Sequence, residues 1–164
     1  MKRMDRLIAR ARSYVGVKEI KGPKHNNIII GWLDRLGAWW SNDETPWCGV
    51  FMGIVMLEEG QPYPTYYMRA KAWLEWGKRI PAPVYGCVVI FGRNGGGHVG
   101  FVVGQDTKGR LLVLGGNQAD EVNVRAFPVS RVLGYRIPRE FDYSQSKALP
   151  VYQEGVIPMS TSEA

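Results

Sequence analysis

The decisive stretch of this 164-residue chain is Gly95-Gly96-Gly97-His98-Val99-Gly100-Phe101-Val102-Val103-Gly104. Its β-branched and aromatic residues predict a strand, and the glycines ahead of it let the backbone approach another element closely. A histidine at the start of such a strand is poorly explained as core filling, because its small neighbours leave room around the imidazole. We therefore take His98 as the candidate catalytic base. The other histidine, His25, lies in a Pro/Asn loop and is the weaker candidate.

The chain around this stretch divides into a helical first half and a strand-rich second half. Apolar residues at helical spacing predict helices over residues 5–15, 28–36, 46–57 and 68–77. Short β-branched runs between Gly, Asn or Asp predict strands over residues 87–91, 98–104, 110–114, 122–127 and 132–136. Helices followed by a meandering antiparallel sheet predict an α+β fold.

Two cysteines compete for the role of nucleophile. Thr45 can cap a helix and Pro46 suits its first turn, so that Cys48 comes at the helix start. Unpaired backbone N–H groups and the positive end of the helix dipole stabilise a thiolate there and predict a lowered Cys48 pKa. Cys87 lies in an apolar strand, where a small buried thiol is unremarkable. We predict that Cys48 is the nucleophile; the alternative is that it packs as a small apolar residue under Trp47.

The hairpin that follows His98 supplies a third group to hold the imidazole in place. A turn over residues 105–110, paired symmetrically, sets Asn117 opposite His98, with Cβ atoms about 4.5–5.5 Å apart. A bulge would shift this register and bring in Gly116 or Gln118 instead. Another reading is that Asn117 only serves the local turn. We predict Asn117 as the orienting residue.

These residues resemble a known group of enzymes. The resemblance rests on Pro46-Trp47-Cys48 opening a helix, on Gly97-His98-Val99-Gly100-Phe101-Val102 on a strand, and on Gly116-Asn117-Gln118 after it. Together they are similar to the CHAP domain, the cysteine, histidine-dependent amidohydrolase/peptidase group of NlpC-type papain-like folds. The resemblance covers residues 5–138, and the nearest likeness is to a subfamily common in phages.

The resemblance implies both a fold and a function. The fold is papain-like, with N-terminal helices, the catalytic cysteine at a helix start, and an antiparallel sheet on which they pack. Members of the family cleave peptidoglycan as endopeptidases or as N-acetylmuramoyl-L-alanine amidases, and the small phage members are endolysins. The implied catalytic residues of this chain are Cys48, His98 and Asn117.

The sequence departs from this family at two places. Many CHAP domains carry a glutamate two residues before the asparagine, where this chain has Gly115, so the orienting role falls on Asn117 with Gln118 in reserve. Some members bind calcium through an Asp-rich loop ahead of the cysteine. The acidic run over residues 42–44 lacks alternating Asp ligands. We therefore expect no metal and no cofactor.

Residues near the cysteine are candidates for binding the substrate. The Cys48 backbone N–H is a natural oxyanion donor, and Asn42 and Asp43 are close enough in sequence to supply a second contact. Aromatic side chains could line the cleft or pack in the core and loops: Trp39, Trp40, Trp47, Tyr66 and Tyr67.

Charge is distributed unevenly along the chain. The net charge is +6, and residues 140–164 carry −3, which leaves +9 on residues 1–139. A basic body predicts attraction to a polyanion. No nucleic-acid-binding signature stands out, so we expect an anionic bacterial envelope and its peptidoglycan as partners, and no nucleic acid; an ordinary basic surface is the alternative. We expect a catalytic domain over residues 1–141, a flexible tail over residues 142–164, and a monomer.

No apolar run reaches the roughly 18–20 residues of a membrane helix, and no secretory signal pattern opens the chain. We expect synthesis in a host cytoplasm and action on the wall after holin-dependent release or from outside. The rivals are an interbacterial amidase toxin or protein deamidase with the same triad, and a non-catalytic wall-binding or phage tail component.

Overall fold

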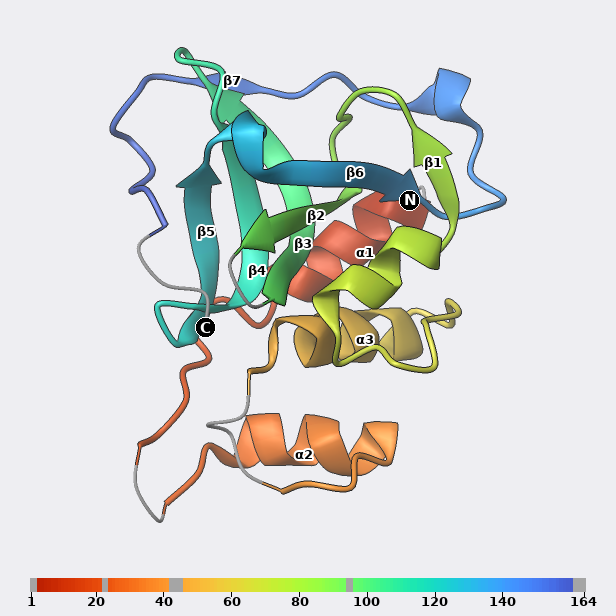
Figure 1. Ribbon diagram of the computed structural model, residues 1–164, viewed down its shortest axis with the longest axis vertical. Helices are drawn as coiled ribbons and strands as arrows, with labels where there is room; N and C mark the ends of the chain where they lie inside the picture. Colours follow the sequence, from red (N-terminus) through yellow and green to blue (C-terminus); the bar gives the residue numbers. More distant parts are fainter. Residues whose placement is uncertain (1–2, 22–23, 42–45, 94–95, 161–164) are drawn as a thin grey trace.

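The structure is a computed structural model that describes residues 3–21, 24–41, 46–93 and 96–160. Its helices come first in the chain, as predicted: α1 (Arg3–Arg12), α2 (Asn27–Leu36), α3 (Cys48–Glu58) and the short 3-10 helix η1 (Ala70–Glu75). Figure 1 shows α3 between the sheet and α2, with α1 beside the sheet. None of the helices in the described ranges is long and apolar enough to cross a membrane.

The position of α3 follows from its composition. Its sequence is apolar on every side, and residues 48–56 are all buried. A helix of this kind has to be enclosed by other elements. On one side α2 covers it with Ile29, Trp32 and Leu33, and on the other it packs against strands of the sheet.

The two outer helices are amphipathic, and their ends are set locally. In α2 the side chain of Asn26 accepts a hydrogen bond from the Ile28 N–H at 2.8 Å, and Gly37 ends the helix in the left-handed conformation. In α1 the buried residues Leu7, Ile8 and Ala11 share one face. The first helix ends at Arg12, earlier than predicted, and the region expected to form a fourth helix is the tight turn of η1.

The sheet is antiparallel apart from one short strand, in the order β1-β6-β2-β3-β4-β5, with β7 added to β3. Its strands are β1 (Lys78–Ile80), β2 (Val88–Arg93), β3 (Gly96–Asp106), β4 (Leu111–Gln118), β5 (Glu121–Phe127), β6 (Val132–Ile137) and β7 (Val151–Tyr152). Val99, Phe101 and Val103 of β3 face the helices. Val102 lies in a second buried cluster with Phe91 and Phe127.

The hairpin from β4 to β5 is irregular where it nears α3. The pair Gly115–Asn123 is followed by the pair Gln118–Glu121, so β4 has one residue more than β5 between them, which is a bulge. Asn117 in the bulge and both turn residues, Ala119 and Asp120, have positive φ, at 58°, 54° and 65°. Three L residues in the left-handed region within four positions store strain in this hairpin.

The C-terminal segment, which we predicted to be a flexible tail, forms backbone pairs with the sheet. β3 extends past the end of β2, which leaves one edge of its final residues open, and β7 pairs there in parallel. Further along, Ala126 of β5 exchanges backbone hydrogen bonds with Pro158 and Ser160. Figure 1 shows the segment crossing the end of the sheet and descending beside β5. Residues 150–152 and 158–160 therefore pair with sheet edges, whose unpaired backbone groups they satisfy.

The strained turn yields a stability prediction. Replacing Ala119 by glycine removes a left-handed cost of about 1–2 kcal/mol and adds about 0.5–1 kcal/mol of chain entropy, so the protein should gain stability. We expect a higher urea midpoint at unchanged m-value. Ala82 is exposed and has no positive φ, so Ala82→Gly is the matched control and should lower the midpoint. Equal destabilisation by both changes would show that the turn stores no strain.

Candidate active site

Cys48 is the first residue of α3 and is 5% exposed. The helix has no side-chain cap, since the preceding residue, Trp47, makes none, and Thr45 lies outside the described residues. Pro46 precedes the helix rather than standing in its first turn. The backbone N–H groups of Gly49 and of Val99 on β3 act on the sulfur and favour its thiolate form. Val99 is the residue that follows His98 in the chain.

Burial has a larger effect on this thiol than the helix start has. Removal from water raises the pKa of Cys48 above its usual value, whereas the N–H groups of Val99 and Gly49 and the positive Arg93 act in the opposite direction. The lowered pKa that the sequence predicted is therefore wrong, because desolvation outweighs the helix N-terminus. At neutral pH the thiol is protonated, and a base has to take its proton before it can act as a nucleophile.

His98 is fully buried in the first part of β3. Its ring stacks on Phe127, with centroids 5.3 Å apart and planes 12° from parallel, and Phe127 stacks in turn on Phe91. Its Nε2 is 2.9 Å from Oε1 of Gln118. The imidazole is therefore held on one face by an aromatic ring and at one edge by an amide.

The orienting contact that we predicted for Asn117 is made by Gln118. The predicted register holds at the pairs Phe101–Leu114 and Val102–Val113. After Gly115 the bulge changes the register, so that Gln118 rather than Asn117 presents its side chain to His98. Asn117 itself is buried in the left-handed conformation. The two glycines at positions 115 and 116 were the sequence signal for this bulge.

Gly115 provides the space that the Gln118 amide occupies. A Cβ atom at residue 115 would meet the Gln118 carboxamide and would lie 3.3 Å from Nε2 of His98. A side chain at this position and the Gln118 amide cannot both lie against the imidazole. Many CHAP domains carry a glutamate where this chain has Gly115. In this chain the side chain that contacts His98 comes from Gln118, three residues later.

The direction of the His98–Gln118 hydrogen bond follows from the surroundings of the amide. Nε2 of Gln118 donates to the backbone oxygens of Val113 and Asn123 and to Oδ1 of Asn123, at 3.1, 2.9 and 3.0 Å. A flipped amide would set its oxygen against these three acceptors. Oε1 therefore accepts from His98, so the neutral ring carries its proton on Nε2 and keeps its lone pair on Nδ1.

The predicted substrate-binding residues fall into three groups. Trp47 is 1% exposed, and its indole N–H donates to Glu19 at 3.1 Å, so it packs in the core. Trp40 is buried as well, whereas Trp39 is 89% exposed and meets it edge to face. Asn42 and Asp43 lie outside the described residues. Of the tryptophans predicted to line a cleft, Trp39 presents its ring to solvent.

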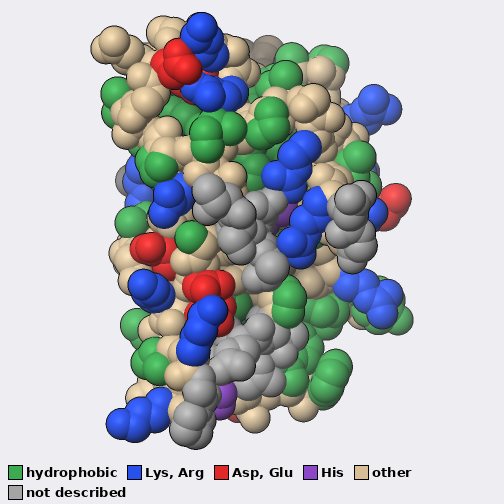
Figure 2. Space-filling model, turned by 60° about the vertical axis from the view of Figure 1, so that its left-hand side comes forward, with side chains coloured by type: hydrophobic (Ala, Val, Ile, Leu, Met, Phe, Trp, Pro, Cys, Tyr) green, Lys and Arg blue, Asp and Glu red, His purple; other side chains and the backbone are tan. Residues whose placement is uncertain are grey.

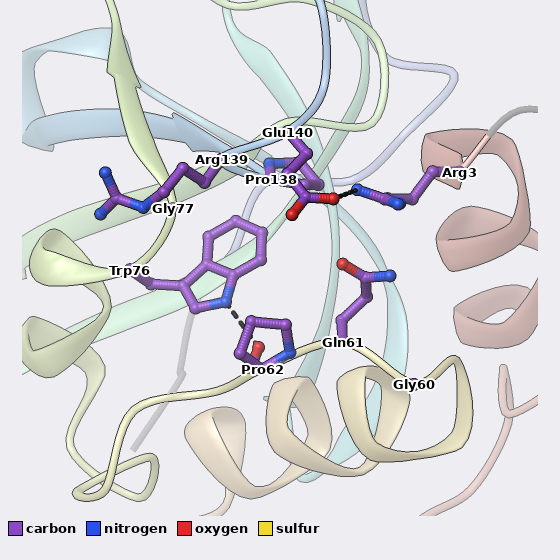
Figure 3. A pocket seen from close by; sticks show the side chains of 9 residues that line it. All are labelled: Arg3, Gly60, Gln61, Pro62, Trp76, Gly77, Pro138, Arg139 and Glu140. Carbon is purple, nitrogen blue, oxygen red and sulfur yellow. Dashed lines mark hydrogen bonds and ion pairs between the residues drawn. The ribbon is translucent and has the colours of Figure 1, made fainter.

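A cavity of about 320 Å³ lies at the other end of α3, between the residues after that helix, the end of η1 and the chain after β6. Figure 3 shows Gln61, Trp76 and Glu140 around it, with Arg3 paired to Glu140 at 3.6 Å. Trp76 is 5% exposed and its indole donates to the Pro62 carbonyl, so little of the ring is open to a ligand. The cavity lining contains neither a cysteine nor a histidine.

Comparison with known proteins supports the fold. Protein-family models gave no match, and no curated protein matched the chain. Among solved structures, the P60 domain of an antigen from M. avium subspecies paratuberculosis is similar, with a TM-score of 0.53 at 18% sequence identity. The match covers 85% of this chain and 96% of that chain. The α+β fold with an antiparallel sheet is confirmed, and it resembles the fold of that P60 domain.

The two cysteines should differ in how their alkylation depends on His98. Burial raises the pKa of Cys87 to about 12, so it should stay unmodified by iodoacetamide below pH 9. Cys48 should react near neutral pH in the wild type, and His98→Ala should move its reaction to higher pH, because no imidazole is then present to take the proton from the thiol. Peptide mass spectrometry across pH 6–10 measures both. Modification of Cys87 first would contradict this assignment.

Proposed function

We propose that the protein is a cysteine hydrolase that cleaves amide bonds of bacterial peptidoglycan, either in the peptide stem or at the muramoyl-L-alanine linkage. The observation that carries the proposal is Cys48 at the start of α3, where the backbone N–H of Val99 favours its thiolate, together with the neighbouring His98 in the chain, which is held by Gln118. A papain-like fold supports it. The finer role is that of a phage endolysin of the CHAP type, which the sequence resemblance supports.

The proposed reaction begins with proton transfer from Cys48 to His98. Because Nε2 of the imidazole donates to Gln118, the proton is taken at Nδ1. The thiolate then attacks the amide carbonyl, and the backbone N–H groups at the uncapped start of α3 stabilise the negative oxygen. His98 returns the proton to the departing amine, leaving an acyl group on Cys48.

The second half of the reaction releases the acyl group. His98 accepts a proton from water, the hydroxide attacks the thioester carbonyl, and the proton passes to the departing thiolate. The products are a free carboxylate and a free amine, with Cys48 regenerated. No redox partner is needed at any step.

The basic surface and Trp39 support an anionic envelope as the setting. Figure 2 shows Lys and Arg side chains over one face, interspersed with acidic ones. With +9 on residues 1–139, long-range attraction would concentrate the enzyme on a negatively charged wall. The exposed Trp39 ring is available for contact with the substrate. We propose that the protein acts there as a monomer after release from the cell in which it is made.

Replacing the nucleophile tests the proposal. Cys48→Ala should abolish the release of soluble fragments from purified peptidoglycan while the protein remains folded, because one buried sulfur is lost. Cys87→Ala is the matched control, since Cys87 is buried just before β2, and it should retain activity with a modest loss of stability. Mass spectrometry of the fragments identifies the bond. An active Cys48→Ala protein would overturn the proposal.

Salt should separate wall attraction from chemistry. Lysis of permeabilised cells should fall as salt rises, because the Debye length shrinks from about 10 Å at 0.1 M to about 3 Å at 1 M. Cleavage of soluble muropeptides should change far less. If salt reduced both activities equally, the proposed attraction to the wall would be wrong, whereas the proposed reaction would be unaffected.

A further inference from the structure

One residue outside the proposed catalytic set holds Gln118 in place. Asn123 lies on β5 directly opposite Gly115. Its backbone oxygen and its Oδ1 accept from Nε2 of Gln118 at 2.9 and 3.0 Å, and its own Nδ2 donates to the Gln118 carbonyl at 2.8 Å. Both the side chain and the main chain of Gln118 are therefore bound to the same neighbour.

These hydrogen bonds between Asn123 and Gln118, which we call the brace, span the most strained part of the backbone. Asn117, Ala119 and Asp120, which flank Gln118, are the non-glycine residues with positive φ within the described ranges. Such conformations cost free energy and persist when the surroundings hold them. Asn123 joins the two strands across this segment, so its amide fixes both the bulge and the carboxamide that it presents.

The brace acts on His98 through the direction of one hydrogen bond. The Gln118 amide accepts from His98 because its Nε2 is already committed to Val113 and Asn123. We propose that Asn123 is a positioning residue, which locks the Gln118 amide and thereby keeps the His98 proton on Nε2 and its lone pair on Nδ1. The inference rests on the proposed function only for its effect on rate, since the proton position is a property of the resting protein.

The test uses the full-length protein with Asn123→Ala and two comparisons. Asn123→Asp keeps an oxygen for Nε2 of Gln118 and loses the donor to the Gln118 carbonyl. Gly37→Ala strains the left-handed residue that ends α2, a loss of about 1–2 kcal/mol at a position where an added Cβ meets nothing within 4 Å, and so controls for stability alone. Nitrogen-15 spectra of histidine-labelled protein report which ring nitrogen carries the proton, and muropeptide kinetics report kcat and KM.

We expect the wild type and Gly37→Ala to show His98 protonated on Nε2. Asn123→Ala should show a mixture of tautomers and a kcat lower by about 10-fold, with KM within about twofold, because orientation rather than binding is lost. Asn123→Asp should give values between those of the wild type and Asn123→Ala, and it replaces the alanine variant if that variant does not fold. An unchanged tautomer and kcat in the Asn123 variants, or an equal loss in Gly37→Ala, would overturn the inference. If the wild-type protein had no hydrolase activity, the proposed function would be wrong, but the spectra would still show whether Asn123 fixes the His98 tautomer.

Discussion

The arrangement of the site depends on one buried hydrogen bond, from Nε2 of His98 to Oε1 of Gln118 at 2.9 Å. Both side chains are fully buried, so water cannot replace either partner and an unmade bond would leave polar atoms unsatisfied. The ring also stacks on Phe127. With one nitrogen committed and one face covered, the imidazole has a single orientation, and the backbone around it has to supply the space and the acceptor.

The β4–β5 hairpin adopts a strained backbone to present Gln118 to His98. Gly115 leaves the space, the bulge turns Gln118 toward the histidine, and positive φ at Asn117, Ala119 and Asp120 completes the turn. A regular hairpin would have alternated its side chains between the two faces of the sheet. Strain next to a buried polar pair is the pattern expected of a functional site rather than of a structure optimised for stability alone.

Much of the fold could be predicted because it depends on local patterns. Apolar spacing located α2, and β-branched runs located the strands from β2 to β6. The Gly-rich stretch also placed His98 at the start of a strand, as the structure has it, although its complete burial was not predicted. What failed depends on neighbours distant in sequence: the pKa of Cys48 is set by how deeply α3 is enclosed, and the burial of Trp47 is set by packing and by Glu19.

The orienting residue was missed by one position for a similar reason. Counting along a regular hairpin leads to Asn117. The count is off by one next to the turn, at Gln105–Leu111 and Gly104–Leu112, and an irregularity between Val102 and Gly104 brings it back into agreement at Val102–Val113 and Phe101–Leu114. The bulge that follows cannot be positioned by counting, although its two glycines permit it. The same limit applies to the segment after residue 141, whose polar composition hides the backbone pairing of β7 with β3.

The most direct test is to compare kcat/KM for muropeptide cleavage by Gln118→Ala and Asn117→Ala, with the fold of each checked by its urea midpoint. The account predicts that Gln118→Ala loses about one to three orders of magnitude, because the imidazole is freed to turn, and that Asn117→Ala loses far less at equal stability. A large loss of kcat/KM in Asn117→Ala, together with an unchanged kcat/KM in Gln118→Ala, would contradict the account.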